Sequence, residues 1–202
     1  YTVDAELALA DAYYLDEEYV LAAETYKDFE SLHPRHDATP YVIYQTGMSL
    51  MKQFRSIDRA TTILQEAHEY FARLQQVYPD SPYAKDAGEK MHTCRRLMAE
   101  HELYIADVFW HMEKYGPAWR RYEYVSENFP DVPEVASHAK EKSLAAYHYY
   151  KEEQGRLTRE KRQGSVRMRS LTLWLTFLMS AALFCSAGKM TSTPAFRDVH
   201  RY

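Results

Sequence analysis

The chain has little cysteine, glycine or proline: two, six and eight residues respectively among 202. Two cysteines are too few for a disulfide scaffold, and scarce glycine and proline exclude collagen-like and low-complexity classes. A hydrophobic content of 46% excludes a disordered chain, because such a composition can bury a core. The abundant Ala, Glu, Leu, Met, Gln and Lys lose little side-chain freedom in a helix. The composition therefore predicts an all-α protein.

Negative charge is concentrated in the first three quarters of the chain. Residues 155–202 hold nine Lys/Arg and two Asp/Glu of the totals of 25 and 29, which leaves 16 and 27 in residues 1–154. An acidic body argues against nucleic-acid binding, which needs a cationic surface. The change of sign predicts a domain boundary at 154–155. Because the sequence starts at Tyr1, we expect any N-terminal targeting signal to lie upstream of it.

An internal repeat of the 34-residue tetratricopeptide type runs through the body. In this pattern a small residue and an aromatic mark a first helix, and an alanine, an aromatic and a proline mark a second. Segments 3–36 and 99–132 match without a gap, whereas segment 40–81 needs an eight-residue insertion at about 55–62. The matching positions are Leu9, Ala10, Tyr13, Ala22, Tyr26 and Pro34; Gly47, Leu50, Ala67, Phe71 and Pro79; and Ile105, Ala106, Phe109, Ala118, Tyr122 and Pro130.

The repeat pattern has a physical basis in helix packing. Small residues let two helices approach closely, aromatics fill the space beside them, and proline ends each second helix. Two further helices are predicted, one over 82–96 with Ser81 as N-cap and Pro82 at its first position, and one over 133–153. Together these elements predict a right-handed tetratricopeptide-repeat solenoid of seven or eight stacked helices over residues 1–154. An ordinary helical bundle is the alternative.

Residue patterns typical of catalysis are absent from the sequence, and the only approach to metal-ligand spacing is His33-x-x-His36, in a loop without a nearby cysteine. Zinc ligands on a helix are spaced i, i+3 or i, i+4, whereas His92, His101 and His111 are nine and ten residues apart. No glycine-rich phosphate loop, G-x-S-x-G or H-E-x-x-H motif occurs. We therefore expect no catalytic residue, no metal and no cofactor. Cys94 is expected to be a packed thiol rather than a reactive one.

Several strings of residues are more specific than the repeat. They are His33–His36, Pro40–Tyr44, Val77–Ala84 (VYPDSPYA), Leu97–Ala106 (LMAEHELYIA) and Asn128–Asp131. Together, in this order, they resemble the BamD (ComL) family, the periplasmic repeat lipoproteins of the machinery that assembles outer-membrane β-barrels. The resemblance covers about residues 1–154. Its lipidated cysteine and first repeat would lie upstream, and the sequence after about residue 155 has no family counterpart.

The resemblance implies a non-enzymatic scaffold at the periplasmic face of the outer membrane of a Gram-negative bacterium. Such a protein would bind the POTRA domains of the barrel-forming BamA subunit and other assembly-machine lipoproteins. It would also receive unfolded outer-membrane proteins and be held by an N-terminal lipid anchor. A generic cell-envelope tetratricopeptide adaptor that binds peptides or partner proteins is the alternative. Neither function involves nucleic acid.

Candidate binding residues follow from the repeat register and from the resemblance. Tyr, Met and Trp on the concave face of the first helices suit an extended client rich in aromatics, although core packing is the more common role of such residues. The client-groove candidates are Leu7, Asp11, Tyr14, Tyr41, Tyr44, Met48, Met51, Leu103, Asp107 and Trp110. For the partner interface the candidates are Arg120, Arg121 and Glu123. Alternatively, Arg121 pairs only with Glu123 or Glu127 on its own surface.

The tail is basic from Arg156 to Arg169 and uncharged from Ser170 to Gly188. A transmembrane helix needs about 20 apolar residues, and positive flanking charge would hold the body in the cytoplasm. From Met168 onwards the tail also has the layout of a secretory signal, with a basic start, an apolar stretch and small residues. Our leading hypothesis for the residues after about 165 is a run-on or frame-shifted reading. A membrane anchor and a core or amphipathic helix are the alternatives.

Overall fold

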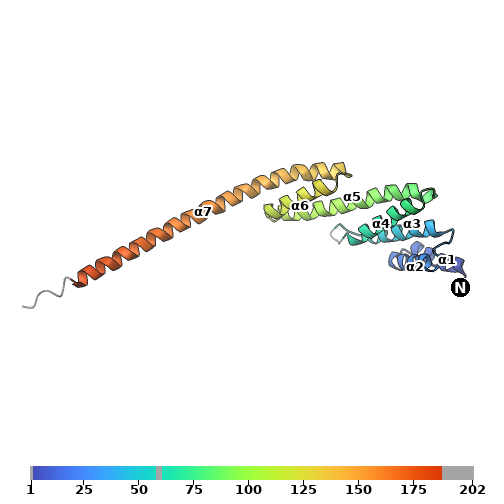
Figure 1. Cartoon of the computed structure of the whole chain (residues 1–202), viewed down its shortest axis with the longest axis horizontal. Helices are drawn as coiled ribbons and strands as arrows, with labels where there is room; N and C mark the ends of the chain where they lie inside the picture. The colour runs from blue at the N-terminus through green and yellow to red at the C-terminus, as the bar shows by residue number, and fades with distance from the viewer. Residues whose placement is uncertain (1, 58–60, 188–202) are drawn as a thin grey trace, which may run out of the picture. The chain divides into compact units, whose positions relative to one another are not determined.

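The computed structural model describes residues 2–57 and 61–187, without the side chains of residues 170 and 174–187. The described residues form helices and the connections between them, which confirms the predicted all-α class (Figure 1). The helices are α1 (Val3–Leu15), α2 (Tyr19–Leu32), α3 (Thr39–Gln53), α4 (Thr62–Val77), α5 (Pro82–His111), α6 (Tyr115–Asn128) and α7 (Pro133–Ala187).

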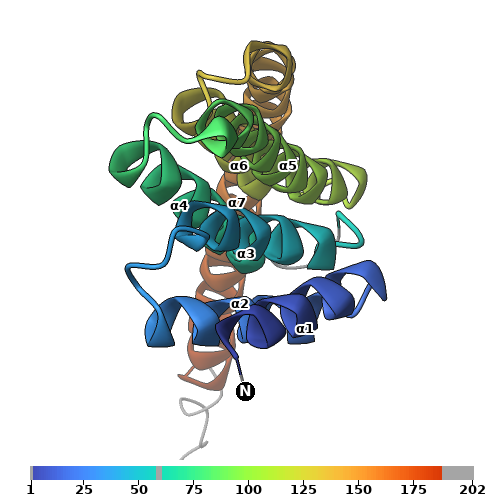
Figure 2. The same ribbon diagram turned by 90° about the vertical axis from the view of Figure 1, so that its right-hand side faces the viewer.

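The chain divides into two compact units, Tyr1–Tyr150 and Lys151–Tyr202, with the boundary inside α7. In the first unit the consecutive helices from α1 to α6 pack against one another in sequence order, and α3 also contacts α5 (Figure 2). Packing between sequence neighbours is typical of solenoids. The first unit is therefore a tetratricopeptide-like stack of helix pairs, as predicted.

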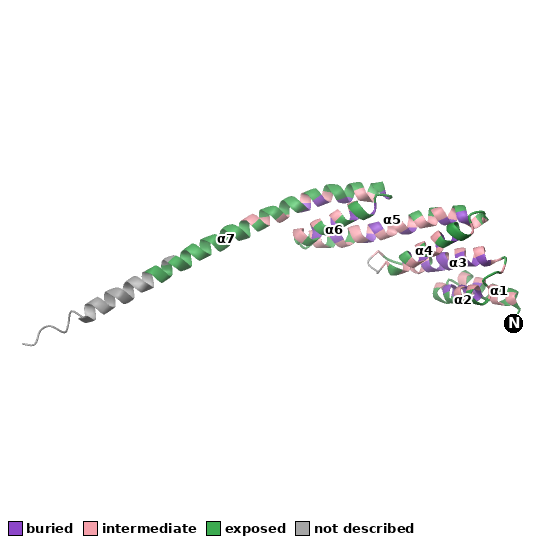
Figure 3. Ribbon diagram, in the orientation of Figure 1, coloured by how far each residue is buried: buried purple, intermediate pink, exposed green. Residues whose placement is uncertain are grey.

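The residues that define the repeat form the core of the first unit. Tyr26, Phe71 and Tyr122, the aromatics of the three second helices, are completely buried. Figure 3 shows the buried positions of this unit on its packed helices, whereas α7 beyond it is mostly exposed. Gly47 shows why a small residue must face them, because a Cβ at this position would lie 2.7 Å from Cε1 of the Phe71 ring. The other small residues of the pattern are buried as well: Ala10, Ala22, Ala67, Ala106 and Ala118.

The two ungapped repeats, 3–36 and 99–132, are equivalent in backbone as well as in sequence. Glu17 and Glu113 occupy the same repeat position, and they have φ angles of 61° and 57°. The left-handed region costs a non-glycine residue roughly 1–2 kcal/mol. In both repeats this residue lies in the tight turn between the two helices. The shared conformation indicates that the packing of the two helices sets the geometry of the turn.

We predicted a helix over 82–96 and a separate repeat helix after it, but the structure has one continuous helix, α5. Its start is as predicted, because Pro82 takes the first position and the Ser81 side chain accepts a hydrogen bond from the Tyr83 amide (3.3 Å). Its predicted end is wrong. Residues 89–111 contain neither glycine nor proline, so nothing in the sequence stops the helix. As a result, α5 packs against both α4 and α6.

The helix predicted over 133–153 is also longer, because α7 continues to Ala187. The basic segment is rich in good helix formers and contains no proline. Among the described residues, no helix has the length and apolar character needed to cross a membrane. Part of the proposed run-on or signal-like segment, residues 188–202, lies outside the described residues.

The insertion predicted at about 55–62 falls in the connection between α3 and α4. His101, a buried residue of α5, is hydrogen-bonded through Nδ1 to the carbonyl of Ile57 in this connection. His101, whose spacing from the other histidines argues against a metal site, therefore anchors the widened part of the middle repeat.

Candidate binding surface

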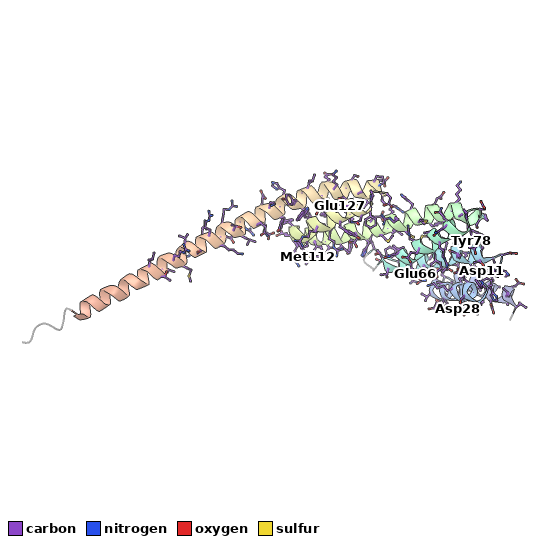
Figure 4. All side chains as sticks on the ribbon, in the orientation of Figure 1. Asp11, Asp28, Glu66, Tyr78, Met112 and Glu127 are labelled. Carbon is purple, nitrogen blue, oxygen red and sulfur yellow. The ribbon has the colours of Figure 1, made fainter. Side chains whose placement is uncertain are left out.

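Two carboxylates of the candidate set, Asp11 and Asp107, point into the interior of the stack. Each accepts a hydrogen bond from the hydroxyl of the tyrosine fifteen residues later, Tyr26 or Tyr122, over 2.5 Å. Burial is the main reason why the pKa of both tyrosines is raised. Asp11, labelled in Figure 4, also accepts a hydrogen bond from Tyr41 of α3 (2.8 Å). Asp107 thus joins the helices of one repeat, and Asp11 also joins two repeats.

The middle repeat has lost both partners of this pair. Met48 stands at the position of Asp11, and Phe71 stands at that of Tyr26. Both side chains belong to a single apolar cluster. Leaving one partner of a buried hydrogen bond unpaired is costly, whereas replacing both by apolar groups is nearly neutral. The joint change indicates that the Asp–Tyr bond is a structural unit of the repeat.

Tyr41 and Tyr44 of α3 meet Tyr83 of α5, and these three residues form the N-terminal aromatic group. The Tyr83 ring centroid lies 5.6 Å from that of Tyr41 and 5.4 Å from that of Tyr44, on which it stacks. The Tyr44 hydroxyl donates to Asp86, one turn further along α5. Burial, followed by this hydrogen bond, raises the pKa of Tyr44. The group connects α3 directly to α5 and leaves all three rings half-buried.

A hollow of about 650 Å³ opens beside the N-terminal aromatic group. Tyr41 and Tyr83 line it, together with the connections that precede α3 and α5. Pro40, Tyr78, Pro79 and Pro82 make much of its wall apolar and rigid, and Asp37 and Asp80 also contribute to it. The hollow is therefore shaped to take an apolar or aromatic side chain.

The other N-terminal candidates pack against the core. Leu7 and Tyr14 border the cluster around Tyr26, and Met48 and Met51 border the cluster around Phe71. All four are half-buried. These residues contribute part of their surface to solvent and part to the stability of the stack.

Trp110 lies in a second set of rings, which we name the C-terminal aromatic group. Its ring centroid is 5.4 Å from that of Tyr115 and 5.5 Å from that of Tyr149, and the Lys142 ammonium lies 5.6 Å from it. Leu103, one of the client-groove candidates, packs against the two clusters that surround Val125 and Tyr122. The C-terminal aromatic group, formed by Trp110, Tyr115 and Tyr149, thus joins α5, α6 and the start of α7 within the first unit.

The structure brings the aromatic candidates together in two places rather than along one continuous groove. Tyr83 and Trp110 lie on the same helix, α5, 27 residues apart in number, which is about 40 Å at 1.5 Å per residue. Sequence reasoning missed Tyr83 and Asp86 because we placed the start of α5 outside the repeats. Their i, i+3 spacing, which puts both on one helix face, was the available signal.

The partner-interface candidates lie on α6. Arg121 forms an ion pair with Glu102 of α5, with 2.5 Å between Nη1 and Oε2. The expected partners Glu123 and Glu127 are wrong, because residues two and six positions away on a helix do not face Arg121. Arg120 is exposed and has no ion pair within the described part of the chain. Glu123 is half-buried.

Arg120 and Arg121 share one open hollow of about 440 Å³ on the α5–α6 surface. Its other lining residues are Glu102, Phe109, Pro117 and Tyr124. Glu102 pairs with Arg121, whereas Arg120 has no carboxylate partner in the described chain. The hollow therefore combines the apolar side chains of its lining with the positive charge of Arg120. Such a surface suits a carboxylate next to an apolar side chain.

Arg95 of α5 holds the connection between α6 and α7. Its guanidinium donates to both carboxylate oxygens of Asp131 (2.9 and 2.6 Å) and to the Asn128 carbonyl (2.7 Å). It also lies 4.5 Å from the centroid of the Phe129 ring. The hydrogen bonds from Arg95 lower the pKa of the Asp131 carboxyl.

Replacing Asp131 by asparagine is expected to make the protein less sensitive to acid. Because the pKa of Asp131 is lowered on folding from 3.8, its ionised form stabilises the fold above about pH 4. This contribution is lost as the pH falls through the folded pKa. Wild type should exceed Asp131→Asn at pH 7 by no more than about 1 kcal/mol, since Asp131 is 41% exposed, and the difference should vanish in stronger acid.

Thermal unfolding followed by circular dichroism across this pH range measures the effect. The matched control is Asp80→Asn, since Asp80 occupies the equivalent place before α5 and has no ion pair among the described residues. A stability difference between wild type and Asp131→Asn that is the same at neutral and acidic pH would contradict the assignment.

Cys94 is fully buried, and burial raises the pKa of its thiol to about 11. The thiolate is therefore scarce at neutral pH, and the expected packed role is confirmed. Among the side chains that the structure describes, no group of three or more His, Cys, Asp or Glu is placed to hold a metal ion. The candidate binding surfaces of the first unit are therefore the hollows and ring groups formed by aromatic, apolar and arginine side chains.

The stacked helix pairs, with aromatic groups left half-exposed on their surface, define a tetratricopeptide-type binding module. The model of the YfiO family, described as an outer membrane lipoprotein, matches residues 1–163. The chain therefore belongs to the YfiO (BamD) family, as its sequence resemblance implied. Membership confirms the expected location at the periplasmic face of the outer membrane of a Gram-negative bacterium.

Curated relatives agree with this assignment. The chain is 31% identical over 157 residues to outer membrane protein assembly factor BamD of Vibrio cholerae, which covers 73% of the chain and 65% of the relative. It is 28% identical over 151 residues to the same factor of Neisseria meningitidis serogroup A (70% and 55% covered). For Haemophilus influenzae the identity is 27% over 142 residues (65% and 54%). The chain thus spans between about half and two thirds of these relatives.

Proposed function

We propose that the chain is a non-enzymatic scaffold subunit of the β-barrel assembly machinery. It binds the POTRA region of the barrel subunit and other assembly lipoproteins, and it helps receive unfolded outer-membrane proteins for insertion. The observation that carries this proposal is the family match over residues 1–163, together with relatives named as outer membrane protein assembly factors. The geometry supports it, because the stack offers separate surfaces for two binding partners.

The partner surface in this proposal is the α5–α6 hollow. Arg120 provides a charge that no carboxylate of the described chain neutralises, and Arg121 is held in place by Glu102. A carboxylate of a POTRA domain would form a charge-assisted hydrogen bond with Arg120, while its apolar neighbour covers Phe109 and Tyr124. Both arginines predicted from the sequence as partner contacts are exposed, and Arg120 is the one with no ion pair in the described chain.

The client surface in this proposal is formed by the two aromatic groups. Their rings are fixed by contacts with one another, so little entropy is lost when an aromatic client residue packs on them. The hollow beside Tyr41 and Tyr83 adds a place for one side chain. An extended chain spans about 3.3 Å per residue, so about 12 residues of an unfolded barrel protein, one strand and part of the turn that follows, can reach both groups.

Substitution of Arg120 by glutamate is expected to weaken POTRA binding at least roughly tenfold, as expected for loss of a charge-assisted interfacial bond. The test is isothermal titration of the full chain with the POTRA region of the same organism's barrel subunit. Arg35→Glu is the matched control, since Arg35 is exposed and unpaired in the described chain and lies in the α2–α3 connection. Equal weakening by both variants would move the interface elsewhere. No binding by a folded chain would favour a generic envelope adaptor.

A further inference from the structure

The second unit carries a cluster of basic side chains that the proposed function does not use. Residues 156–169 contain five arginines and one lysine but a single acidic residue, Glu160. All fourteen are exposed. Among the described residues the one ion pair in this segment is Arg156–Glu160, at a distance of 3.9 Å. The other five cations have no carboxylate partner in the described chain.

The helix places most of these basic side chains on one face. With 3.6 residues per turn, the five arginines fall within an arc of about 160° of the α7 circumference. The opposite side carries Leu157, Met168 and Leu171, which are 37, 66 and 52% exposed. The separation is partial, because Lys161 lies on the side of Leu157 and Met168, while the exposed Val166 and Leu173 lie on the arginine side. A basic segment that also exposes apolar residues is typical of helices that bind an anionic membrane surface. The arginine face is formed by Arg156, Arg159, Arg162, Arg167 and Arg169.

In place of the run-on hypothesis for the residues after about 165, we propose that residues 156–173 of α7 are a functional segment that binds the surface of a membrane containing anionic phospholipid. The planar guanidinium groups bind lipid phosphates, and Leu157, Met168 and Leu171 enter the apolar layer below the headgroups. Charge complementarity favours an anionic lipid surface, because the segment has an excess of five positive charges and exposes apolar side chains beside them. The uncharged, largely apolar residues 170–188 follow the basic segment directly in the sequence.

The test measures co-sedimentation of the full chain with phosphatidylethanolamine vesicles that contain or lack phosphatidylglycerol. We expect binding only to vesicles with phosphatidylglycerol, and binding should weaken as salt is raised. Changing the five arginines to glutamine should lower the apparent affinity at least roughly tenfold. The matched control removes five exposed, unpaired cations of the body. These are Arg35, Lys52, Lys85, Lys114 and Lys140, each changed to glutamine.

Each other outcome overturns the proposal. Equal binding to both kinds of vesicle would assign attachment to apolar contact alone, and no binding would remove it. Equal losses in the two variants would show an effect of total charge rather than of the α7 arginines. Sedimentation velocity without vesicles tests whether the arginines instead bind a second copy of the chain. If the arginines instead promote self-association at low salt, their partner is the acidic body of a second copy.

Discussion

Replacing Gly47 by alanine is expected to lower the free energy of unfolding by about 2 kcal/mol, although alanine is the better helix former by about 1 kcal/mol. The added Cβ would lie 2.7 and 2.8 Å from Cε1 and Cζ of Phe71. Phe71 is completely buried in the core of the middle repeat, so its ring cannot move aside without disturbing its neighbours. Overpacking therefore exceeds the gain in helix propensity. The melting temperature should fall by about 4–8 °C.

Gly88→Ala is the matched control for this prediction. Its Cβ would also meet a side chain closely, at 2.8 Å, but the atom is the terminal nitrogen of the exposed Gln75. That nitrogen donates a hydrogen bond to the Ala84 carbonyl (2.9 Å), and moving it into solvent exchanges this bond for one with water, at a cost of about 1 kcal/mol. Because alanine gains about 1 kcal/mol in helix propensity, Gly88→Ala should change the free energy of unfolding by less than about 0.5 kcal/mol. Phe71→Leu should cost less in the Gly47→Ala background than in wild type. Equal melting temperatures for the two alanine variants would contradict the packing argument.

Replacing Asp107 by alanine is expected to destabilise the first unit by about 2 kcal/mol. The change leaves the hydroxyl of Tyr122, a completely buried residue, without its acceptor. Tyr122→Phe should cost less, since water can reach the half-buried Asp107 carboxylate once the hydroxyl is gone. The double variant should be about as stable as Tyr122→Phe alone. Chemical unfolding of the four proteins gives the coupling energy of the pair.

The first repeat provides an internal comparison for this cycle. Asp11 accepts hydrogen bonds from both Tyr26 and Tyr41, so Asp11→Ala should cost more than Asp107→Ala. The middle repeat already has the doubly apolar form, with Met48 and Phe71 at the two positions. Additive effects of Asp107→Ala and Tyr122→Phe would show that the carboxylate and the hydroxyl contribute independently, contrary to the structure.

Much of the stack was predictable from sequence because its packing is local and repeated. A small residue such as Ala10 and an aromatic such as Tyr26 recur at fixed spacing, and both are buried as expected. The continuation of α5 past residue 96 was not predictable from the repeats. One helix can end one repeat unit and begin the next when no helix-breaking residue separates them. The continuous α5 carries both Tyr83 near its start and Trp110 near its end.

The candidate surface was less predictable than the core. A repeat register identifies the helix face of Asp11 and Asp107, but it does not say whether a tyrosine of the second helix reaches their carboxylates. It also cannot identify the partner of Arg121, because Glu102 approaches it from a neighbouring helix. Side-chain pairs between helices depend on the crossing geometry, which composition and spacing leave open.

The measurement that tests the proposed scaffold role most directly is sedimentation velocity of three components together. They are the full chain, the POTRA region of the same organism's barrel subunit, and an unfolded outer-membrane protein diluted from urea. The account predicts a ternary complex that requires the chain, because the α5–α6 hollow and the aromatic groups are separate surfaces. The client should remain bound when Arg120→Glu removes the POTRA region. Competition between client and POTRA region for the chain, or client capture that does not depend on the chain, would contradict the account.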